Sequence, residues 1–131
     1  MNATPPPCDI DIVIVSLLGG EALAACLQQL APWQGRCHVV LPAQNDIATW
    51  RARFPQAHFL AGEGQPVPLR RQRGVLAAQG AFVALLEDTT LPEPGWLAAA
   101  CDAFANERIA AVAGPISVAP DWICVSPPNW L

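Results

Sequence analysis

Residues 10–16 read Ile-Asp-Ile-Val-Ile-Val-Ser, a nearly continuous run of β-branched side chains. Such a run is typical of a strand that is covered on both faces, as the strands of a parallel sheet are. Residues 21–30 follow with apolar side chains at helical spacing, and Pro32 then ends the predicted helix. The first two elements are therefore a buried strand and an amphipathic helix.

The same alternation continues along the chain. Short apolar runs predict strands, and amphipathic runs between them predict helices, one capped by Asn45 and another ended by Gly80 in a left-handed conformation. Strands and helices that alternate over short connections are the signature of an α/β fold with a mostly parallel sheet. The expected strands are 10–16, 37–41, 58–60, 82–86 and 109–113, and the expected helices are 21–30, 45–54, 69–79 and 96–105.

Composition excludes several classes of protein. Of the 131 residues, 53% are hydrophobic and 14% are charged, which excludes intrinsic disorder as the main state and suits a single domain. The net charge of −4 gives no basic surface for nucleic acid. Neither a signal peptide nor a transmembrane segment is evident, so we expect a cytoplasmic location.

The cysteines indicate neither a disulfide framework nor a zinc site. They are odd in number and widely spaced, and no two of them form a Cys-x-x-Cys pair. We therefore expect reduced and mostly buried thiols. The five residues are Cys8, Cys26, Cys37, Cys101 and Cys124.

Two acidic residues, Glu87 and Asp88, directly follow the apolar run 82–86. In a parallel sheet this position is the carboxyl end of a strand, where α/β proteins bind their ligands. Carboxylate oxygens held there suit Mg²⁺ or Mn²⁺ that bridges phosphate oxygens. The alternative interpretation is that both residues begin a solvated turn before the next helix. Spacing alone leaves both interpretations open.

A basic cluster, Arg70, Arg71 and Arg73, opens the helix expected at 69–79. Backbone N–H groups and guanidinium groups in that position can hold a phosphate, and the alternative is a solvated helix face. His38 and His58 have no partner at metal-binding spacing, so we expect each of them to be structural or exposed.

The segment 69–89 resembles the central signature of family 2 glycosyltransferases with the GT-A fold. In that family, a segment of the form Arg-Asn-x-Gly-x-x-x-Ala-x-Gly leads through a strand into an Asp-x-Asp motif. Residues 91–97 resemble the family's start of the next helix, and the whole resemblance covers roughly residues 9–118. Gln72 stands where asparagine is usual, and the matching residues are Arg71, Gly74, Ala78 and Gly80.

This resemblance implies a three-layer, Rossmann-like GT-A domain that binds a nucleoside diphosphate sugar. It also implies a bound Mg²⁺ or Mn²⁺, with Asp88 as its ligand. The residues implied to bind the nucleotide sugar are Ser16 and Leu17 near the base, Arg71 and Gly74 near the diphosphate, and Glu87 and Asp88 near the ribose and metal.

The chain departs from the family pattern where activity depends on it. Thr89 stands where the last, metal-coordinating aspartate of the motif falls, and a hydroxyl is a poor substitute for a carboxylate on these ions. The family's acceptor site and catalytic base lie beyond the resembling segment, so no catalytic residue is assigned. We expect a glycosyltransferase-like protein that is truncated or impaired as a catalyst when alone. Its expected parts are a Pro-rich lead (1–8), the nucleotide-sugar-binding domain (9–118) and a Pro- and Trp-containing tail (119–131).

Two other hypotheses stay open. A non-catalytic interaction or oligomerisation module could use the same fold, with an exposed strand edge and the Trp-bearing tail docking onto a partner subunit or a second copy in a homo-oligomer. A small flavodoxin-like or receiver-like domain is the third hypothesis. It is disfavoured because neither a phosphate loop nor an early acidic pair follows the first strand.

Overall fold

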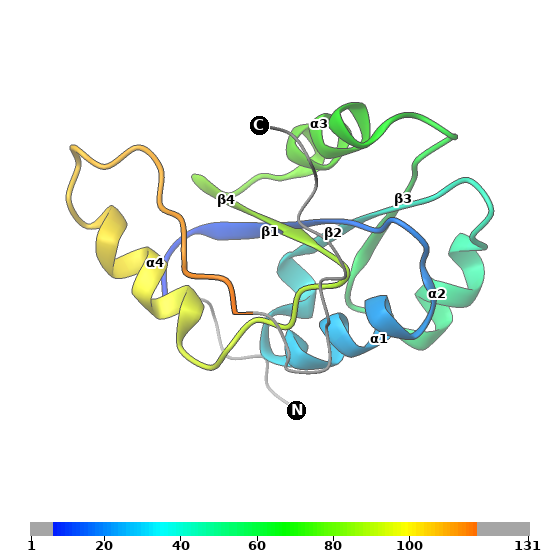
Figure 1. The fold of residues 1–131 in the computed structure, drawn as a ribbon, viewed down its shortest axis with the longest axis horizontal. Helices are drawn as coiled ribbons and strands as arrows, with labels where there is room; N and C mark the ends of the chain where they lie inside the picture. Colours follow the sequence, from blue (N-terminus) through cyan, green and yellow to red (C-terminus); the bar gives the residue numbers. More distant parts are fainter. Residues whose placement is uncertain (1–6, 118–131) are drawn as a thin grey trace, which may run out of the picture.

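The computed structural model describes residues 7–117, whose strands assemble into one parallel sheet (Figure 1). Most elements lie within one or two residues of the predicted ranges, and a short 3-10 helix, η1, is added between two of them. In chain order they are β1 (Ile10–Val15), α1 (Gly20–Gln29), η1 (Ala31–Arg36), β2 (Cys37–Leu41), α2 (Ile47–Arg53), β3 (His58–Ala61), α3 (Val67–Ala77), β4 (Phe82–Glu87) and α4 (Trp96–Phe104).

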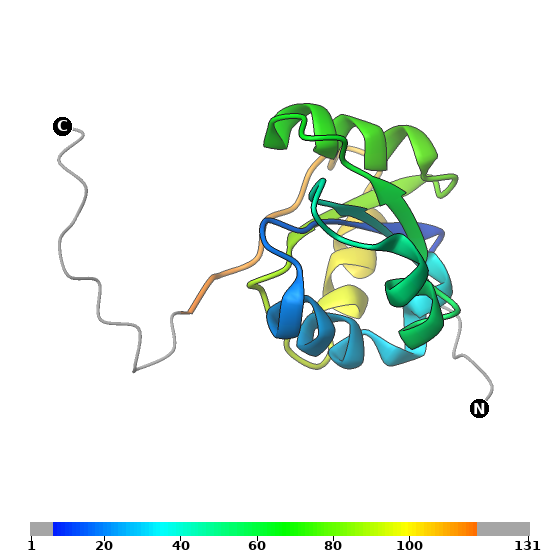
Figure 2. The ribbon, with the colours of Figure 1, turned by 90° about the vertical axis from the view of Figure 1, so that its right-hand side faces the viewer.

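The sheet has four strands in the order β3-β2-β1-β4, and all of their pairings are parallel. Helix α3 lies on one face, while α1, α2 and α4 lie on the other, which gives three layers (Figures 1 and 2). This arrangement confirms the predicted α/β, Rossmann-like fold with a parallel central sheet. Within residues 7–117, no helix is long and apolar enough to cross a membrane.

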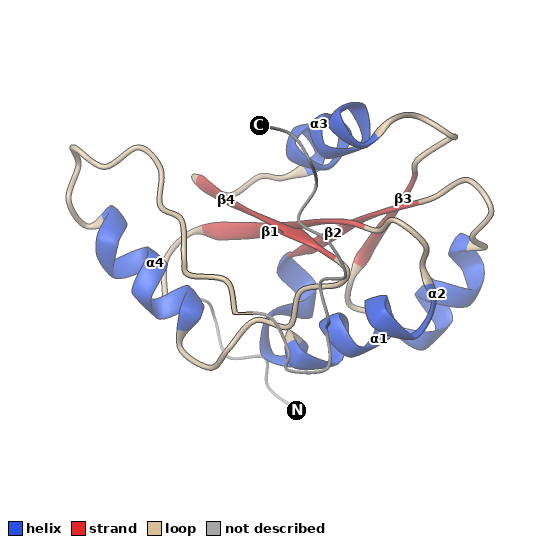
Figure 3. Cartoon of the chain, viewed as in Figure 1, coloured by secondary structure: helices blue, strands red, loops and turns tan. Residues whose placement is uncertain are grey.

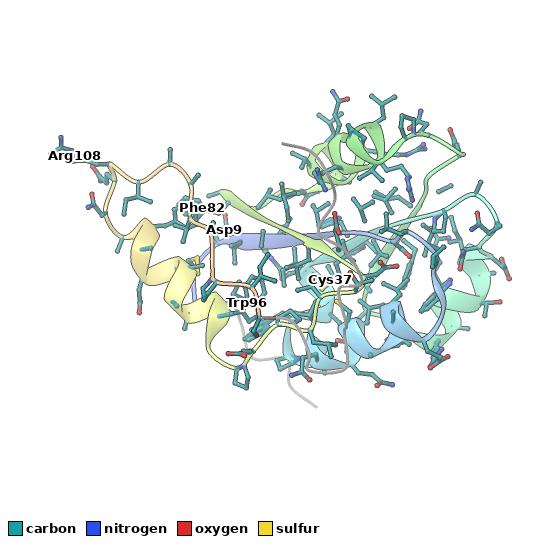
Figure 4. All side chains as sticks on the ribbon, viewed as in Figure 1. Asp9, Cys37, Phe82, Trp96 and Arg108 are labelled. Carbon is teal, nitrogen blue, oxygen red and sulfur yellow. A yellow bond between two sulfur atoms is a disulfide. The ribbon has the colours of Figure 1, made fainter. Side chains whose placement is uncertain are left out.

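Strand β1 lies at the centre of the core because it pairs on both sides and is buried along its whole length. Ile12 and Ile14 pack toward α1 and α2, where they belong to the larger apolar cluster. Ile10 joins a smaller cluster with Leu97 of α4. Trp96 is partly buried and packs against both clusters (Figure 4).

Helix α3 approaches the other face of the sheet at Gly74. A Cβ atom there would overlap Cγ1 of Val13 and come within 3.2 Å of a methyl group of Val40. The missing side chain therefore lets the helix backbone lie directly on β1 and β2. This contact fixes which side of α3 faces the sheet, and it places Arg70, one turn earlier, over the carboxyl ends of the strands.

The predicted strand at 109–113 is wrong, because residues 108–117 form no strand in the structure and are exposed. Three of the five residues in this segment are alanine, which is depleted in strands. Pro115 follows closely, and a proline cannot donate a hydrogen bond to a sheet. The apolar character of the segment therefore did not suffice to make it a strand.

The two predicted helix ends also need correction. Asp46, not Asn45, caps α2, since its carboxylate accepts hydrogen bonds from the backbone N–H groups of Ala48 and Thr49 at 3.0 and 3.3 Å. Asn45 instead accepts a hydrogen bond from the indole of Trp50. Helix α3 ends before Gly80, which is not in the left-handed region. Gly80 packs too tightly against the backbone of β1 to carry a side chain.

The expectation of reduced thiols is wrong for two of the cysteines. Cys8 and Cys101 form a disulfide that links the segment before β1 to α4 across 93 positions of sequence. Cys26 and Cys37 are free and buried, as expected, and Cys124 lies outside the described residues. Burial raises the pKa of Cys37 to about 12 and that of Cys26 to about 11, so both stay protonated. Disulfides persist mainly in oxidising compartments, and a cytoplasmic location therefore stays a prediction.

Candidate functional site

The carboxyl ends of β1 and β4 bring three of the predicted site residues together. Because Val15 pairs with Glu87 in the sheet, the residues that follow these two strands are neighbours. The hydroxyl of Ser16 donates to Oδ2 of Asp88 at 2.6 Å, and the backbone N–H of Leu17 donates to the same oxygen at 3.0 Å. Both Ser16 and Asp88 are buried, so the pair holds the loop after β1 in place.

Arg70 reaches the same loop from α3. Its Nη1 donates a hydrogen bond of 2.6 Å to the carbonyl oxygen of Ser16, and the residue is only 8% exposed. Within residues 7–117, three arginines have no carboxylate partner, and of these Arg51 and Arg108 are exposed whereas Arg70 is buried. Buried charges are usually paired, so a buried guanidinium without a carboxylate favours an anionic ligand.

Two buried polar atoms at this edge have no hydrogen-bond partner among residues 7–117. They are Nε of Arg70 and Oδ1 of Asp88, one a donor and the other an acceptor. Ser16 lies between them, since it bonds to both side chains. Because buried polar atoms are nearly always satisfied, this pair indicates a place that a ligand or ordered water completes.

A pocket of about 220 Å³ opens at the same edge of the sheet. Its walls come from the loops after β1 and β2, from the loop before α3 and from α3 itself. The pocket is smaller than the roughly 300–1,000 Å³ of a typical small-molecule site, so it fits one part of a larger ligand. It is lined by Leu17, Pro42, Ala43, Gln44, Gly64, Gln65 and Arg70.

A larger hollow of about 310 Å³ lies on the outer side of α3. Its lining residues are Gln65, Leu69, Gln72, Arg73 and Leu76, of which Arg73 belongs to the predicted basic cluster and Gln65 also lines the first pocket. It is open to solvent, and neither Arg70 nor a residue of the loops after β1 and β2 lines it, so we do not place the site there.

The other predicted site residues lie apart from this pocket. Nη2 of Arg71 and Oε1 of Glu87 form an ion pair at 3.3 Å, and both side chains are partly exposed. Gly74 is buried against the sheet, as described above, so its lack of a side chain is explained by packing. Arg70, and not Arg71, lines the pocket at this edge of the sheet.

The carboxylates at this edge do not form a ready site for a divalent cation. Asp88 is 2% exposed, and its Oδ2 is engaged by Ser16 and Leu17. Glu87 is paired with Arg71. Within the described residues, no three His, Cys, Asp or Glu side chains gather in a group that could hold a metal. Asp88 is therefore the one buried carboxylate that this edge offers to the expected Mg²⁺ or Mn²⁺. The residues present do not fit a divalent-cation site.

A second polar cluster, which the sequence interpretation missed, lies near the opposite ends of the strands. Asp11 of β1 is buried, and it accepts hydrogen bonds from the backbone N–H groups of Gln79 and Gly80 at 2.7 and 3.0 Å. Arg36 pairs with its other oxygen at 2.6 Å, and Nε2 of His38 lies 3.2 Å from Oδ2. Burial alone would raise the pKa of Asp11, but these partners lower it below 3.8. A lone aspartate inside the run 10–16 was the signal for this cluster.

His38 makes stability depend on pH. Burial lowers its pKa below the ordinary 6.5, although the charge of Asp11 opposes the change. The unfolded chain then takes up a proton that the folded chain does not, so the free energy of unfolding should fall as the pH drops below about 6.5. Chemical denaturation at a series of pH values above about 5, where the carboxylates stay ionised, measures this fall, and His38→Gln should remove it. An unchanged fall in that variant would contradict the assignment.

Comparison with known proteins does not identify a family for this chain. No protein-family model matches it, and no curated protein matches it.

Proposed function

We propose that the domain binds a nucleoside diphosphate sugar at the carboxyl edge of its sheet, as the donor-binding part of a glycosyltransferase-like protein. The observation that carries the proposal is Arg70, a buried guanidinium with no carboxylate partner that lines the pocket at this edge. The position agrees with the general rule that open parallel sheets bind ligands beyond the carboxyl ends of their strands.

The ligand chemistry follows from the two unsatisfied atoms. A diphosphate oxygen would accept the hydrogen bond that Nε of Arg70 now lacks, and a sugar hydroxyl would donate to Oδ1 of Asp88. A phosphorylated sugar or nucleoside carries both groups on one molecule. The pocket beside Arg70 leaves room for a ring, with Gln44 and Gln65 at its wall.

The proposed contribution to chemistry is positioning and charge stabilisation. A guanidinium held in place by the carbonyl oxygen of Ser16 would stabilise the negative charge that develops on a departing diphosphate. Ser16 itself is buried and bonded to Asp88, so we do not assign it as a nucleophile. The proposal assigns no catalytic base and no acceptor.

A thermal-shift panel tests the proposal. UDP, GDP, dTDP, CMP and the corresponding nucleotide sugars would each be added with and without Mn²⁺. A ligand at about 100 times its dissociation constant adds about 2.7 kcal/mol to the free energy of unfolding, which is several degrees for a domain of this size. We expect one nucleotide and its sugar to raise the unfolding temperature. No shift with any of them, in folded protein, would contradict donor binding by this chain.

A further inference from the structure

Strand β4 has one unpaired edge. One edge of β4 pairs with β1. On its opposite edge, β4 pairs with no described residue and forms the border of the sheet (Figure 3). The backbone N–H of Phe82 donates to Asp9, next to β1. Since backbone groups alternate along a strand, the N–H and C=O groups of Val83 and Leu85 point away from β1. These groups can form hydrogen bonds with a further strand.

The edge carries none of the usual protection against such pairing. Edge strands are commonly blocked by charged side chains, proline or bulges. Residues 82–86 are all apolar, and only Glu87, at the end of the strand, is charged. Leu85 is 53% exposed, which is a large apolar surface for the middle of a strand.

Residues 109–113 do not cover this edge. The sequence pattern predicted a strand in this segment. In the structure the segment is exposed and forms no hydrogen bond with a strand. The edge therefore has no partner strand within residues 7–117. The sequence of β4 itself indicates which strand could pair with it.

We propose that β4 of a second copy pairs with this edge in the antiparallel sense, with the two-fold axis at Ala84. In that register, Val83 of each copy lies opposite Leu85 of the other, and both pairs are hydrogen-bonded across the edge. The small side chain of Ala84 lies at the axis. Each Glu87 stays at an end of the paired strands, where it keeps its ion pair with Arg71.

Neighbouring registers fit less well. An axis at Leu85 would place Val83 opposite Glu87 of the second copy, so that an apolar residue would face a charged one. The register at Ala84 pairs the whole apolar segment 82–86 with the same segment of the second copy. Because the same patch serves both copies, the pairing closes as a two-fold dimer and does not grow into a fibre.

The dimer would leave the proposed nucleotide site untouched. Antiparallel pairing points the carboxyl edges of the two sheets in opposite directions, so each pocket stays at a free end of the joined sheet. The inference therefore goes beyond the proposed function, and either one can fail without the other.

Leu85→Pro is the variant that tests the pairing. Proline removes the outward N–H of Leu85, and with it half of the hydrogen bonds proposed between the Val83–Leu85 pairs, but none of the hydrogen bonds from β4 to β1, so the fold should persist. Analytical ultracentrifugation of the full chain should give the mass of two chains for the wild type and of one chain for this variant. Leu85→Ala keeps the backbone N–H, and we expect it to remain a dimer. Leu85→Lys, which also keeps that N–H, should give the mass of one chain and serves if the proline variant does not fold.

Disulfide trapping tests the register. Across the two-fold axis, the Cα atoms of two Ala84 residues would lie about 4.5 Å apart, within the range that a disulfide spans. Ala84→Cys should therefore form a covalent dimer on a non-reducing gel. Leu86→Cys is the matched control, because its two copies would lie more than about 13 Å apart. A monomeric wild type, a Leu85→Pro dimer, or equal trapping through both cysteines would overturn the proposal.

Discussion

Replacing Arg70 by methionine is expected to weaken nucleotide binding by roughly tenfold to a hundredfold. A hydrogen bond to a charged group contributes about 1.5–3 kcal/mol, and each 1.4 kcal/mol changes the dissociation constant about tenfold. Methionine keeps much of the apolar stem, so the variant should still fill the space beside Ser16. Isothermal titration with the nucleoside diphosphate that gives the largest thermal shift would measure the change.

Arg73→Met is the matched control for this experiment. Arg73 lies on the same helix but is partly exposed and pairs with Glu63, and neither of these two residues lines the pocket. We expect its dissociation constant to match that of the wild type. The unfolding temperature of each variant shows whether a loss of binding comes from a folded protein. Unchanged binding in folded Arg70→Met, or equal losses in both variants, would contradict the site.

Removing the Cys8–Cys101 disulfide is expected to lower the free energy of unfolding by about 2–5 kcal/mol. The bond closes a loop of 93 positions, and a long loop of this kind restricts the unfolded chain strongly. Urea denaturation of the oxidised wild type and of the double variant Cys8→Ala, Cys101→Ala would give the difference.

A reducing agent provides the control. It should lower the free energy of unfolding of the wild type to that of the double variant, because the two proteins differ in the disulfide. It should leave the double variant unchanged, since the cysteines that remain within residues 7–117, Cys26 and Cys37, are free and buried. Equal stability of the oxidised and reduced wild type would show that the bond does not contribute.

The arrangement of the sheet could be predicted from the sequence because the signals were local. The β-branched run at 10–16 and the apolar run at 82–86 mark strands without any knowledge of their neighbours. Once both strands are placed in a parallel sheet, their carboxyl ends must meet at one edge. That is why Ser16 and Asp88, which are 72 positions apart, could be suspected together and are found hydrogen-bonded.

The features that the sequence missed depend on contacts between distant elements. Which of Arg70 and Arg71 faces the site depends on how α3 is rotated on the sheet, and the contact at Gly74 sets that rotation. The spacing of four between Arg70 and Gly74 could have indicated a shared helix face. The disulfide had no such signal, because Cys8 lies before the first strand and Cys101 lies on the last described helix.

The position of that disulfide also decides how the domain carries mechanical force. All four strands lie between Cys8 and Cys101 in the sequence, so tension applied at the two chain ends passes from one cysteine to the other through the covalent bond. The hydrogen bonds between β1 and β4 then bear none of the load. The segment between the two cysteines should therefore add no length when the oxidised protein is pulled, and it should extend only after reduction, when tension first reaches β1.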